Sequence, residues 1–325
     1  MKSTRAVIRR HGGPEAVIWE EVDCPAPGPG EVLMRNEAVG LNMIDTYHRS
    51  GLYPVALPSG LGVEAAGLVE TVGEGVDHVK PGDRVVTFGP VLGAYSTARC
   101  VPAAGLFVLP DGISFEVAAA SFLKGCTTEF LVERCGEVEA GWSVLVHAAA
   151  GATGQLLVRW LKHVGASVVA TTSTEEKAAI AHAAGADHVI RYGETDVAAA
   201  VRDLTGGEGV RVVFDGVGRA TWQASLESLR KRGLMISFGN ASGAVGKQDI
   251  ASLAQKGSLF ATRPTLFDYY ADPVEAKAGA ARLFALIEQG VIDVDIGQTY
   301  ALTDAAQAHT DLEARRTTGS TLLLP

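Results

Sequence analysis

The turn Ala149-x-Gly151-x-x-Gly154 has the residue types and spacing of a phosphate-binding loop. It follows a short apolar run, Val144 to Ala148, and precedes a segment whose apolar residues recur at helical spacing. Gly151 would let the backbone approach a pyrophosphate, and Gly154 would let the helix pack against the strand. Free N–H groups at the helix start would hold phosphate oxygens. The alternative is a glycine-rich turn in another kind of α/β domain. The expected contacts to a dinucleotide are Ala150, Gly151, Ala152, Thr153 and Gly154.

Five more strands are expected after this unit, which predicts a doubly wound parallel sheet in an α/β fold. Helical segments separate the strands, and Ser173-x-x-Glu176 predicts a capping box at the start of the second helix. Arg263-Pro264 closes the sheet, because proline cannot continue a central strand. The expected strands are Ser167–Thr171, His188–Tyr192, Val210–Asp215, Leu234–Phe238 and Ser258–Thr262.

The end of the second strand indicates which dinucleotide binds. Ligands of such sheets lie outside the carboxyl ends of the strands, and NAD sites usually place an acidic residue after the second strand for the ribose 2′-OH. Here that end is rich in hydroxyl groups, and no carboxylate occurs before Glu175. Lys177 and Tyr192 are near enough in sequence to bind a 2′-phosphate, with Ser173 beside them, so NADPH is favoured. The alternative for Lys177 is an ordinary solvated position on the helix.

The segments on either side of this sheet predict a second, β-rich domain. Residues 1–124 contain short strands with frequent turn signals, which is typical of a barrel-like domain. Residues 264–325 contain helices from about Pro273 to Gln289 and from about Asp304 to Ala314, and little else. Because this is too little to stand alone, we expect it to pack on residues 1–124. The nucleotide-binding domain, residues 125–263, would then be inserted between the two parts.

Composition narrows the functional classes. The chain has 325 residues, with 28 Lys and Arg against 37 Asp and Glu, and the net charge of −9 argues against nucleic-acid binding as its main function. Its four cysteines form no C-x-x-C pair, and scattered cysteines are typical of a reducing cytosol. The N-terminal residues predict a strand rather than a signal peptide, and no apolar run approaches about 18 residues. We therefore expect a cytoplasmic protein without a membrane span.

Several stretches together carry a family resemblance: Gly40–Tyr47, Ser50–Pro54, Ala118–Gly125, Ala148–Gly154, Asp215–Gly218, Arg232–Gly243, Lys256–Leu259 and Gly319–Ser320. Through them, the chain resembles a zinc-independent quinone oxidoreductase of the medium-chain dehydrogenase/reductase superfamily, in its ζ-crystallin-like branch. The resemblance covers essentially the whole chain and is strongest to bacterial quinone reductases. It implies a Rossmann domain inserted into a β-rich, GroES-like catalytic domain. It also implies a homodimer joined through the sixth Rossmann strand, whose apolar edge would invite pairing.

Zinc-dependent relatives in the same superfamily offer a test of the resemblance. Their catalytic zinc uses a Cys three residues before an Asp, and a His in a Gly-His-Glu run. This chain has Asn42 before Asp45 and Val63 before Glu64, and neither side chain replaces a thiolate or an imidazole as a zinc ligand. The four-cysteine structural zinc lobe is missing too. We therefore expect no metal and a structural role for Glu64.

Without zinc, the expected reaction is reduction of an electron-poor acceptor. A quinone accepts a hydride, or electrons stepwise, when a few hydrogen-bond donors stabilise the oxyanion that forms. The resemblance places Asn42, Tyr47 and Tyr53 near the nicotinamide as candidate donors, and Asp45 would orient the loop. Packing roles are the alternatives for both tyrosines.

The resemblance also implies cofactor contacts outside the glycine turn. Thr128 would meet the nicotinamide and Gly216 the adenosine, although close relatives commonly have Ser where this chain has Gly216. Arg315 would complete the 2′-phosphate pocket, with Arg316 leaving the register open by one residue. Asn42 is a cofactor contact as well, and the remaining positions are Phe238, Gly239, Asn240, Ala241, Ser242 and Arg263.

Two other functions remain open from the sequence. An NADPH-dependent enone or alkenal reductase would use the same hydride step with a different pocket. A non-catalytic NADPH-binding protein would be a redox sensor, a nucleic-acid binder or a bulk protein like lens ζ-crystallin. The net charge counts against the nucleic-acid binder, and the retained Asn42 and Tyr47 count against a loss of catalysis.

Overall fold

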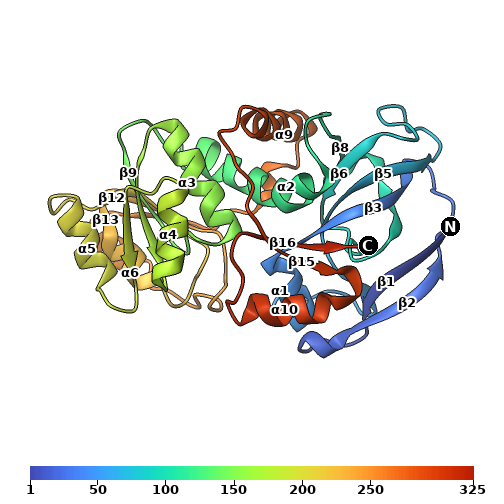
Figure 1. The fold of residues 1–325 in the computed structure, drawn as a ribbon. Helices are drawn as coiled ribbons and strands as arrows, with labels where there is room; N and C mark the ends of the chain where they lie inside the picture. Colours follow the sequence, from blue (N-terminus) through green and yellow to red (C-terminus); the bar gives the residue numbers. More distant parts are fainter. The chain divides into compact units, whose positions relative to one another are not determined.

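The computed structural model describes residues 1–325, and the chain divides into two compact units. Unit 1 consists of Met1–Leu123 and Val294–Pro325, and unit 2 is the continuous segment Lys124–Asp293. The chain therefore begins and ends in unit 1, as the colours of Figure 1 show. None of its helices is both long enough and apolar enough to cross a membrane.

Unit 2 contains a six-stranded parallel sheet with the order β11-β10-β9-β12-β13-β14. Counted along this unit, the order is 3-2-1-4-5-6, which confirms the doubly wound sheet. Its strands are apolar because a parallel sheet is buried on both faces, and Val144 to Val146 are fully buried. The strands are β9 (Ser143–Val146), β10 (Ser167–Thr172), β11 (His188–Arg191), β12 (Val210–Asp215), β13 (Leu229–Ser237) and β14 (Phe260–Thr262).

The helices of unit 2 begin and end for local reasons. α3 begins after Gly151 and ends at Gly165, whose left-handed φ of 91° stops the helix. α4 has Thr174 as its N-cap, and the Thr174 hydroxyl oxygen accepts a hydrogen bond from Lys177 N at 3.3 Å. The expected capping box starting at Ser173 is therefore wrong by one residue. The helices are α3 (Ala152–Val164), α4 (Glu175–Ala183), α5 (Val197–Leu204), α6 (Trp222–Ser228), α7 (Ala251–Gln255), α8 (Leu266–Tyr269) and α9 (Pro273–Glu288), preceded by the end of α2 (Phe115–Glu129) and a π-helix (Phe130–Cys135).

The last two strands of the sheet differ in length from the expectation. β13 begins at Leu229 rather than Leu234, because Leu229 already pairs with Val210, before an irregularity that contains the charged residues and precedes the apolar run. β14 begins only at Phe260, because Ser258 has a φ of 56°, which is incompatible with a strand. β14 is the edge of the sheet, and the Phe260 side chain is 60% exposed there.

Unit 1 is β-rich, as expected. Its larger sheet has the order β15-β16-β3-β5-β6-β8, with β7 also paired to β3, and a smaller sheet has the order β2-β1-β4. Its core joins both parts of the chain, for example Val32 and Val85 with Leu302 and Leu323. The strands are β1 (Lys2–Ile8), β2 (Val17–Asp23), β3 (Glu31–Leu41), β4 (Ser59–Gly60), β5 (Glu64–Val72), β6 (Arg84–Phe88), β7 (Ala98–Pro102), β8 (Leu106–Val108), β15 (Ile296–Ala301) and β16 (Ser320–Leu324).

The C-terminal segment completes this β-rich unit. β16 pairs antiparallel with β3 and parallel with β15, and both C-terminal strands are red in Figure 1. Ser320 Oγ also donates a hydrogen bond to Ala120 O at 2.7 Å. The helices of unit 1 are α1 (Met43–Ser50) and α10 (Ala305–Glu313), with 3₁₀ turns at Pro14–Ala16, Ala103–Gly105 and Leu302–Asp304.

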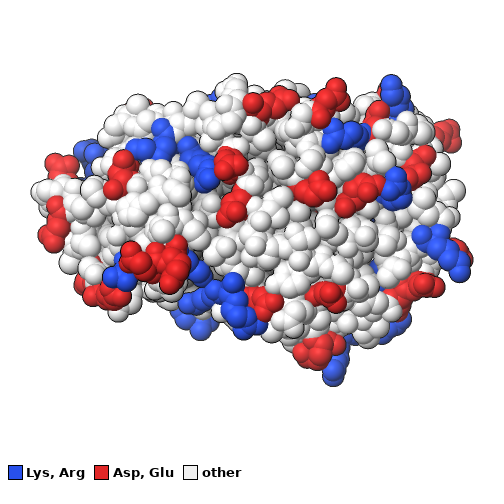
Figure 2. All heavy atoms as spheres, viewed as in Figure 1, with Lys and Arg blue, Asp and Glu red and all other residues white.

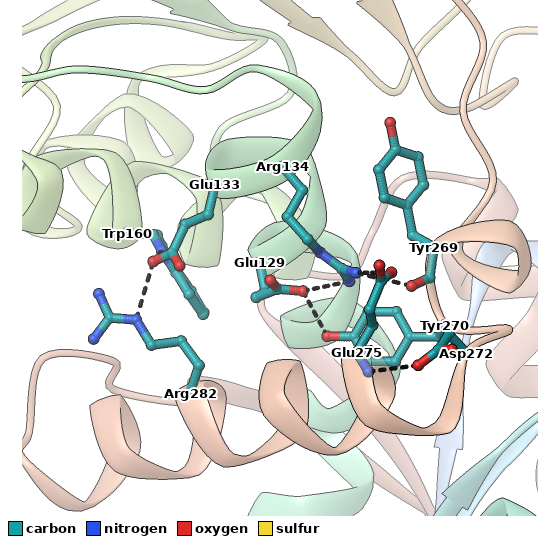
Figure 3. A network of polar contacts seen from close by, with 9 residues as sticks. All are labelled: Glu129, Glu133, Arg134, Trp160, Tyr269, Tyr270, Asp272, Glu275 and Arg282. Atoms are coloured by element: carbon teal, nitrogen blue, oxygen red, sulfur yellow. Dashed lines mark hydrogen bonds and ion pairs between the residues drawn. The ribbon is translucent and has the colours of Figure 1, made fainter.

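A polar network ties α8 and α9 to the beginning of unit 2 (Figure 3). Glu129 Oε2 accepts hydrogen bonds from Arg134 Nη2 and Tyr270 Oη, both at 2.8 Å. Arg282 Nε donates to Glu133 Oε1 at 3.0 Å. The division between the units therefore falls at 293/294 rather than at the expected 263/264, because these contacts hold residues 264–293 to unit 2.

Candidate functional site

The glycine turn lies at the start of α3, at the carboxyl end of the central strand β9. Gly151 is the N-cap of α3, and no side chain caps this helix start. A Cβ on Gly151 would have only Ala148 O near it, at 3.4 Å, whereas a Cβ on Gly154 would lie 2.4 Å from Ala148 O and 2.7 Å from Ala149 Cα. The close packing of α3 against the residues after β9 thus requires a glycine at position 154. Gly151 leaves an open cradle of N–H groups that fits a pyrophosphate.

Two loops lie against each other at the carboxyl ends of β12 and β13. Asp215 organises the first loop, since its Oδ1 accepts hydrogen bonds from Val217 N and Gly218 N at 2.8 and 2.9 Å. Phe238 N donates to Asp215 O at 2.9 Å, and a Cβ on Gly216 would lie 2.9 Å from Phe238 Cζ. The glycine at position 216 therefore leaves room for the Phe238 ring.

The second of these loops contains the other expected cofactor contacts. Ser242 Oγ donates to Val217 O at 2.8 Å. Arg263 Nη1 donates to Ser237 O at 2.9 Å and to Gly239 O at 3.1 Å. These bonds hold the loop 238–242 and the Arg263 guanidinium near the carboxyl ends of the strands, where the glycine turn also lies.

β10 and β11 end side by side, where a 2′-phosphate is expected. Tyr192 follows β11 directly, donates its N–H to Thr172 O at 3.1 Å, and is 42% exposed. Lys177 is half-buried in the first turn of α4, and Ser173 is exposed. The structure thus brings Ser173, Lys177 and Tyr192 to one corner of the sheet.

Arg191 is a further cation at this corner, which the sequence did not predict. Its Nη1 lies 3.2 Å from Glu175 Oε2, and its Nη2 lies 2.7 Å from Glu194 Oε2. Glu175, the first carboxylate after β10, is therefore already paired with a cation. No local pattern indicates this pair, because Arg191 stands simply as the last residue of a predicted strand.

In unit 1, the helix α1 and the turn after it position two phenol groups. The ring centroids of Tyr47 and Tyr53 are 5.1 Å apart, with an edge-to-face angle of 63°. Gly51 reverses the chain with a φ of 83°, which lets Tyr53 N donate to Tyr47 O at 3.1 Å. Tyr47 is buried and Tyr53 half-buried. The two expected hydrogen-bond donors thus form one pair.

Asn42, the N-cap of α1, has its amide group fixed by a buried carboxylate. Asn42 Nδ2 donates to Glu64 Oε2 at 2.8 Å and to Gly40 O at 3.3 Å. Glu64 is fully buried, and its Oε1 accepts from Leu123 N at 2.6 Å. A carboxylate can only accept, so the nitrogen of the amide must face it. The NH₂ group of Asn42 is thus engaged within the chain, and its donation to an oxyanion stays a prediction that these bonds do not favour.

Asp45 is an internal residue that fixes α1 and faces other parts of unit 1. It is fully buried, and its Oδ2 accepts hydrogen bonds from Asn42 N at 2.9 Å and Tyr95 Oη at 3.0 Å. Tyr95 Oη lies 2.9 Å from His309 Nε2, and Arg49 Nη1 lies 3.0 Å from His309 Nδ1. Arginine can only donate, so Nδ1 accepts and Nε2 carries the hydrogen that points to Tyr95. Asp45 therefore holds the start of α1 to the rest of unit 1, and its orienting role in the site stays a prediction.

Burial sets the protonation of this network. It lowers the pKa of His309 to about 3, with a further contribution from the Arg49 charge, so the imidazole is neutral. It also raises the pKa of Tyr95 well above 10, and the Asp45 charge adds to that shift. The sequence could not reveal these residues, because Tyr95 and His309 are 214 positions apart and Arg49 and His309 are 260 apart.

The hydrogen bonds of Thr128 and Arg316 limit which groups they have available for a cofactor. Thr128 Oγ1 donates to Lys124 O at 2.9 Å within α2, so its hydroxyl hydrogen is used there. Arg316 Nε donates to Asp311 Oδ1 at 2.9 Å, so of the two arginines whose register was open, Arg315 remains the candidate.

His147 is a satisfied core residue. Its ring nitrogens lie 2.9 Å from Thr171 Oγ1 and 3.0 Å from Ser225 Oγ, and burial lowers its pKa.

Residues that could hold a metal do not gather in this chain. No group of three or more His, Cys, Asp or Glu side chains is placed to hold a metal ion, and all four cysteines are free. At the positions of the superfamily's zinc ligands, Asn42 is bonded to Glu64 and Val63 is buried.

Family models that match parts of both units identify the chain as a medium-chain dehydrogenase/reductase. Residues 28–111 match the model of the alcohol dehydrogenase GroES-like domain, and residues 152–269 match that of the zinc-binding dehydrogenases.

Full-length relatives define the family more narrowly. The chain is 49% identical to a quinone oxidoreductase of Salmonella typhimurium, over 99% of this chain and 100% of that one. It is 43% identical to a 2-haloacrylate reductase of Burkholderia sp., over 98% of each chain. A crystal structure of the Escherichia coli quinone oxidoreductase complexed with NADPH superposes with a TM-score of 0.97, at 49% identity over 99% of this chain and 100% of that one. The chain therefore belongs to the quinone oxidoreductase family of the medium-chain dehydrogenase/reductase superfamily.

Proposed function

We propose that this protein is an NADPH-dependent quinone oxidoreductase. The observation that carries the proposal is the open glycine turn at the start of α3, on a sheet whose neighbouring strand ends without an unpaired carboxylate. The family supports it, since relatives of about half identity are quinone oxidoreductases and one was crystallised with NADPH. The test is NADPH oxidation with 1,4-benzoquinone and 9,10-phenanthrenequinone, run in parallel with NADH. A protein that binds NADPH but reduces no quinone would contradict it.

The residues of unit 2 fit NADPH in distinct roles. The N–H groups after Gly151 would hold the pyrophosphate, and Lys177 and Tyr192 would bind the 2′-phosphate through charge-assisted and phenolic hydrogen bonds. The loop 238–242 and Arg263 would line the rest of the cofactor. Arg315 and Thr128 stay predictions from the resemblance. When bound, NADPH supplies the hydride for the reaction.

The residues of unit 1 would act on the acceptor. The phenol O–H groups of Tyr47 and Tyr53 would donate to the quinone oxygen on which negative charge develops. Asn42 Oδ1 would accept a hydrogen bond from the cofactor, because its NH₂ group is held by Glu64 and Gly40. Asp45 and Tyr95 would keep α1 in place while this occurs.

A second candidate substrate is an activated alkene. The 43% identical 2-haloacrylate reductase favours this alternative, since a carbon–carbon double bond beside a carboxylate accepts hydride by the same principle. Rates with a 2-haloacrylate and with a short 2-alkenal, measured beside the quinones, would decide between the two. A kcat/KM for the alkene above that for every quinone would make this protein an alkene reductase.

We also propose a cytoplasmic homodimer that pairs through β14. β14 is a sheet edge with an exposed Phe260, and such an edge is a template for another strand. The free cysteines support a reducing compartment. Light scattering at micromolar concentration tests the dimer, and Ala261→Pro, which blocks strand pairing at the edge, should give a monomer. A wild-type protein that is monomeric would contradict this assembly.

A further inference from the structure

A pocket of unit 2 lies at the amino ends of the sheet strands, whereas the glycine turn lies at their carboxyl ends. Its volume is about 580 Å³, and it is formed where β12, β13 and β14 begin, with Gly207, Leu229 and Gly257 among its walls. In a doubly wound sheet the nucleotide binds at the carboxyl ends of the strands, and this pocket is at the amino ends. The pocket is within the size range of small-molecule sites, roughly 300–1,000 Å³.

The pocket carries a strong excess of positive charge. The residues that line it include one acidic residue, Glu208, and six basic ones: Arg202, Arg211, Arg230, Lys231, Arg232 and Lys256. The chain as a whole has a net charge of −9, so this concentration runs against the overall balance. Cations held together in a concave surface raise the local concentration of anions.

Three of these cations build the wall of the pocket. The Arg202 guanidinium donates to four backbone carbonyl oxygens, in the loop before β12 and around the start of β13. Arg211 Nη1 donates to Arg232 O at 2.9 Å. Lys256 Nζ pairs with Glu227 Oε1 at 3.0 Å. These bonds fix the backbone that carries the other cations.

The other three cations have no partner within the chain. Arg230, Lys231 and Arg232 are consecutive at the start of β13, and their side chains make no hydrogen bond or ion pair. Arg232 has a φ of 59°, a conformation that residues with side chains rarely adopt. Its N–H donates to Gly257 O at 2.8 Å, which together with Arg211 holds it there. Backbone strain retained in this way is common at ligand sites.

We propose that this pocket binds a small, multiply charged phosphate anion of the inorganic pyrophosphate type. Guanidinium and ammonium groups on a fixed backbone match the oxygens of linked phosphates through charge-assisted hydrogen bonds. No aromatic side chain lines the pocket, so it has no platform on which a base could stack. On the face drawn in Figure 2, basic and acidic side chains are mixed and neither sign forms a continuous band. An extended nucleic acid is therefore the less suitable occupant.

The test is calorimetric titration of inorganic pyrophosphate into the NADPH-saturated protein, at an ionic strength held constant with NaCl. Saturating NADPH keeps the probe from the glycine turn. The expected result is one pyrophosphate bound per chain. In Arg230→Gln/Lys231→Gln, the Kd should rise by about tenfold for each cation removed. The matched control, Lys247→Gln/Lys277→Gln, changes the charge of unit 2 equally at exposed positions outside the pocket, and its Kd should equal that of the wild type.

Three results would overturn the proposal. The first is an absence of pyrophosphate binding to the wild type. The second is equal weakening in both double variants, which would show a general charge effect. The third is that a single-stranded RNA, and no pyrophosphate, binds with the expected dependence on Arg230 and Lys231. Quinone reduction should be unchanged in both double variants, so failure of this proposal is distinguishable from failure of the proposed function.

Discussion

The glycine turn of unit 2 and the helix α1 of unit 1 are built in opposite ways. At the turn, the functional groups are backbone N–H groups, and what matters is the absence of side chains at Gly151 and Gly154. At α1, the functional groups are side chains, and Asn42 and Asp45 are held by buried partners distant in sequence. A backbone site can thus be specified by a short local sequence, whereas a side-chain site depends on the folding of the whole unit around it.

Acid should destabilise unit 1 through His309, with the largest expected effect. The pKa of His309 is about 3 in the folded protein, against 6.5 for an ordinary histidine. Between those values the unfolded chain binds a proton that the folded chain does not, so stability falls as the pH drops from 6.5 towards 3, by up to about 5 kcal/mol. Urea unfolding of the wild type and His309→Gln, measured from pH 7 to 4, should show a shallower loss in the variant. Equal losses of stability in the two proteins would show that His309 does not cause the acid sensitivity.

The two glycines of the turn should separate folding from binding. Gly154→Ala places a Cβ against backbone atoms and should cost about 3 kcal/mol of the free energy of unfolding. Gly151→Ala meets only one atom, at 3.4 Å, and should leave stability within about 0.5 kcal/mol. It should nevertheless weaken NADPH binding, because the new methyl group occupies the cradle. Urea unfolding and cofactor titration measure the two effects, and equal destabilisation by both alanines would refute this distinction.

Tyr95→Phe tests whether the network behind α1 supports the site. The variant leaves the buried Asp45 carboxylate without one donor and should cost about 2 kcal/mol of unfolding free energy. The matched control is Tyr300→Phe, which removes a half-buried hydroxyl that donates to Asp311 at 2.8 Å and should cost less than about 1 kcal/mol. If Tyr95 positions α1, kcat should fall more than KM changes. A loss of stability with unchanged kcat would make its role purely structural.

Lys177→Ala is expected to have the smallest effect, confined to one cofactor. Loss of one charge-assisted hydrogen bond to a 2′-phosphate should raise KM for NADPH by about tenfold and leave NADH nearly unchanged. Lys247→Ala, at an exposed position of the same unit, serves as the control and should alter neither value. Equal weakening of both cofactors would show that Lys177 is structural.

The same contrast explains how much the sequence predicts. The sheet of unit 2 could be predicted from local patterns, because each buried strand contains a short apolar run. The glycines that begin and end α3 are likewise explained by their immediate neighbours. The start of β13 escaped prediction because the charged residues Arg230 to Arg232 separate Leu229, which is paired with Val210, from the apolar run that begins at Leu234. The partners of α1 escaped it because Tyr95, His309 and Glu64 act through contacts that only the folded chain creates. The orientation of the Asn42 amide is likewise fixed by Glu64, 22 positions away.

The insertion of unit 2 has a consequence for synthesis on the ribosome. Residues 124–293 are contiguous, so this unit can fold once its own last residue has left the exit tunnel. Unit 1 must wait, because β3 receives its partner β16 only when residues 320–324 have been synthesised. Until then, the edge of β3 that β16 will cover is open to solvent and to other nascent chains. The synthesis of β16, long after that of β3, therefore decides when the earlier part of unit 1 is protected from misassembly.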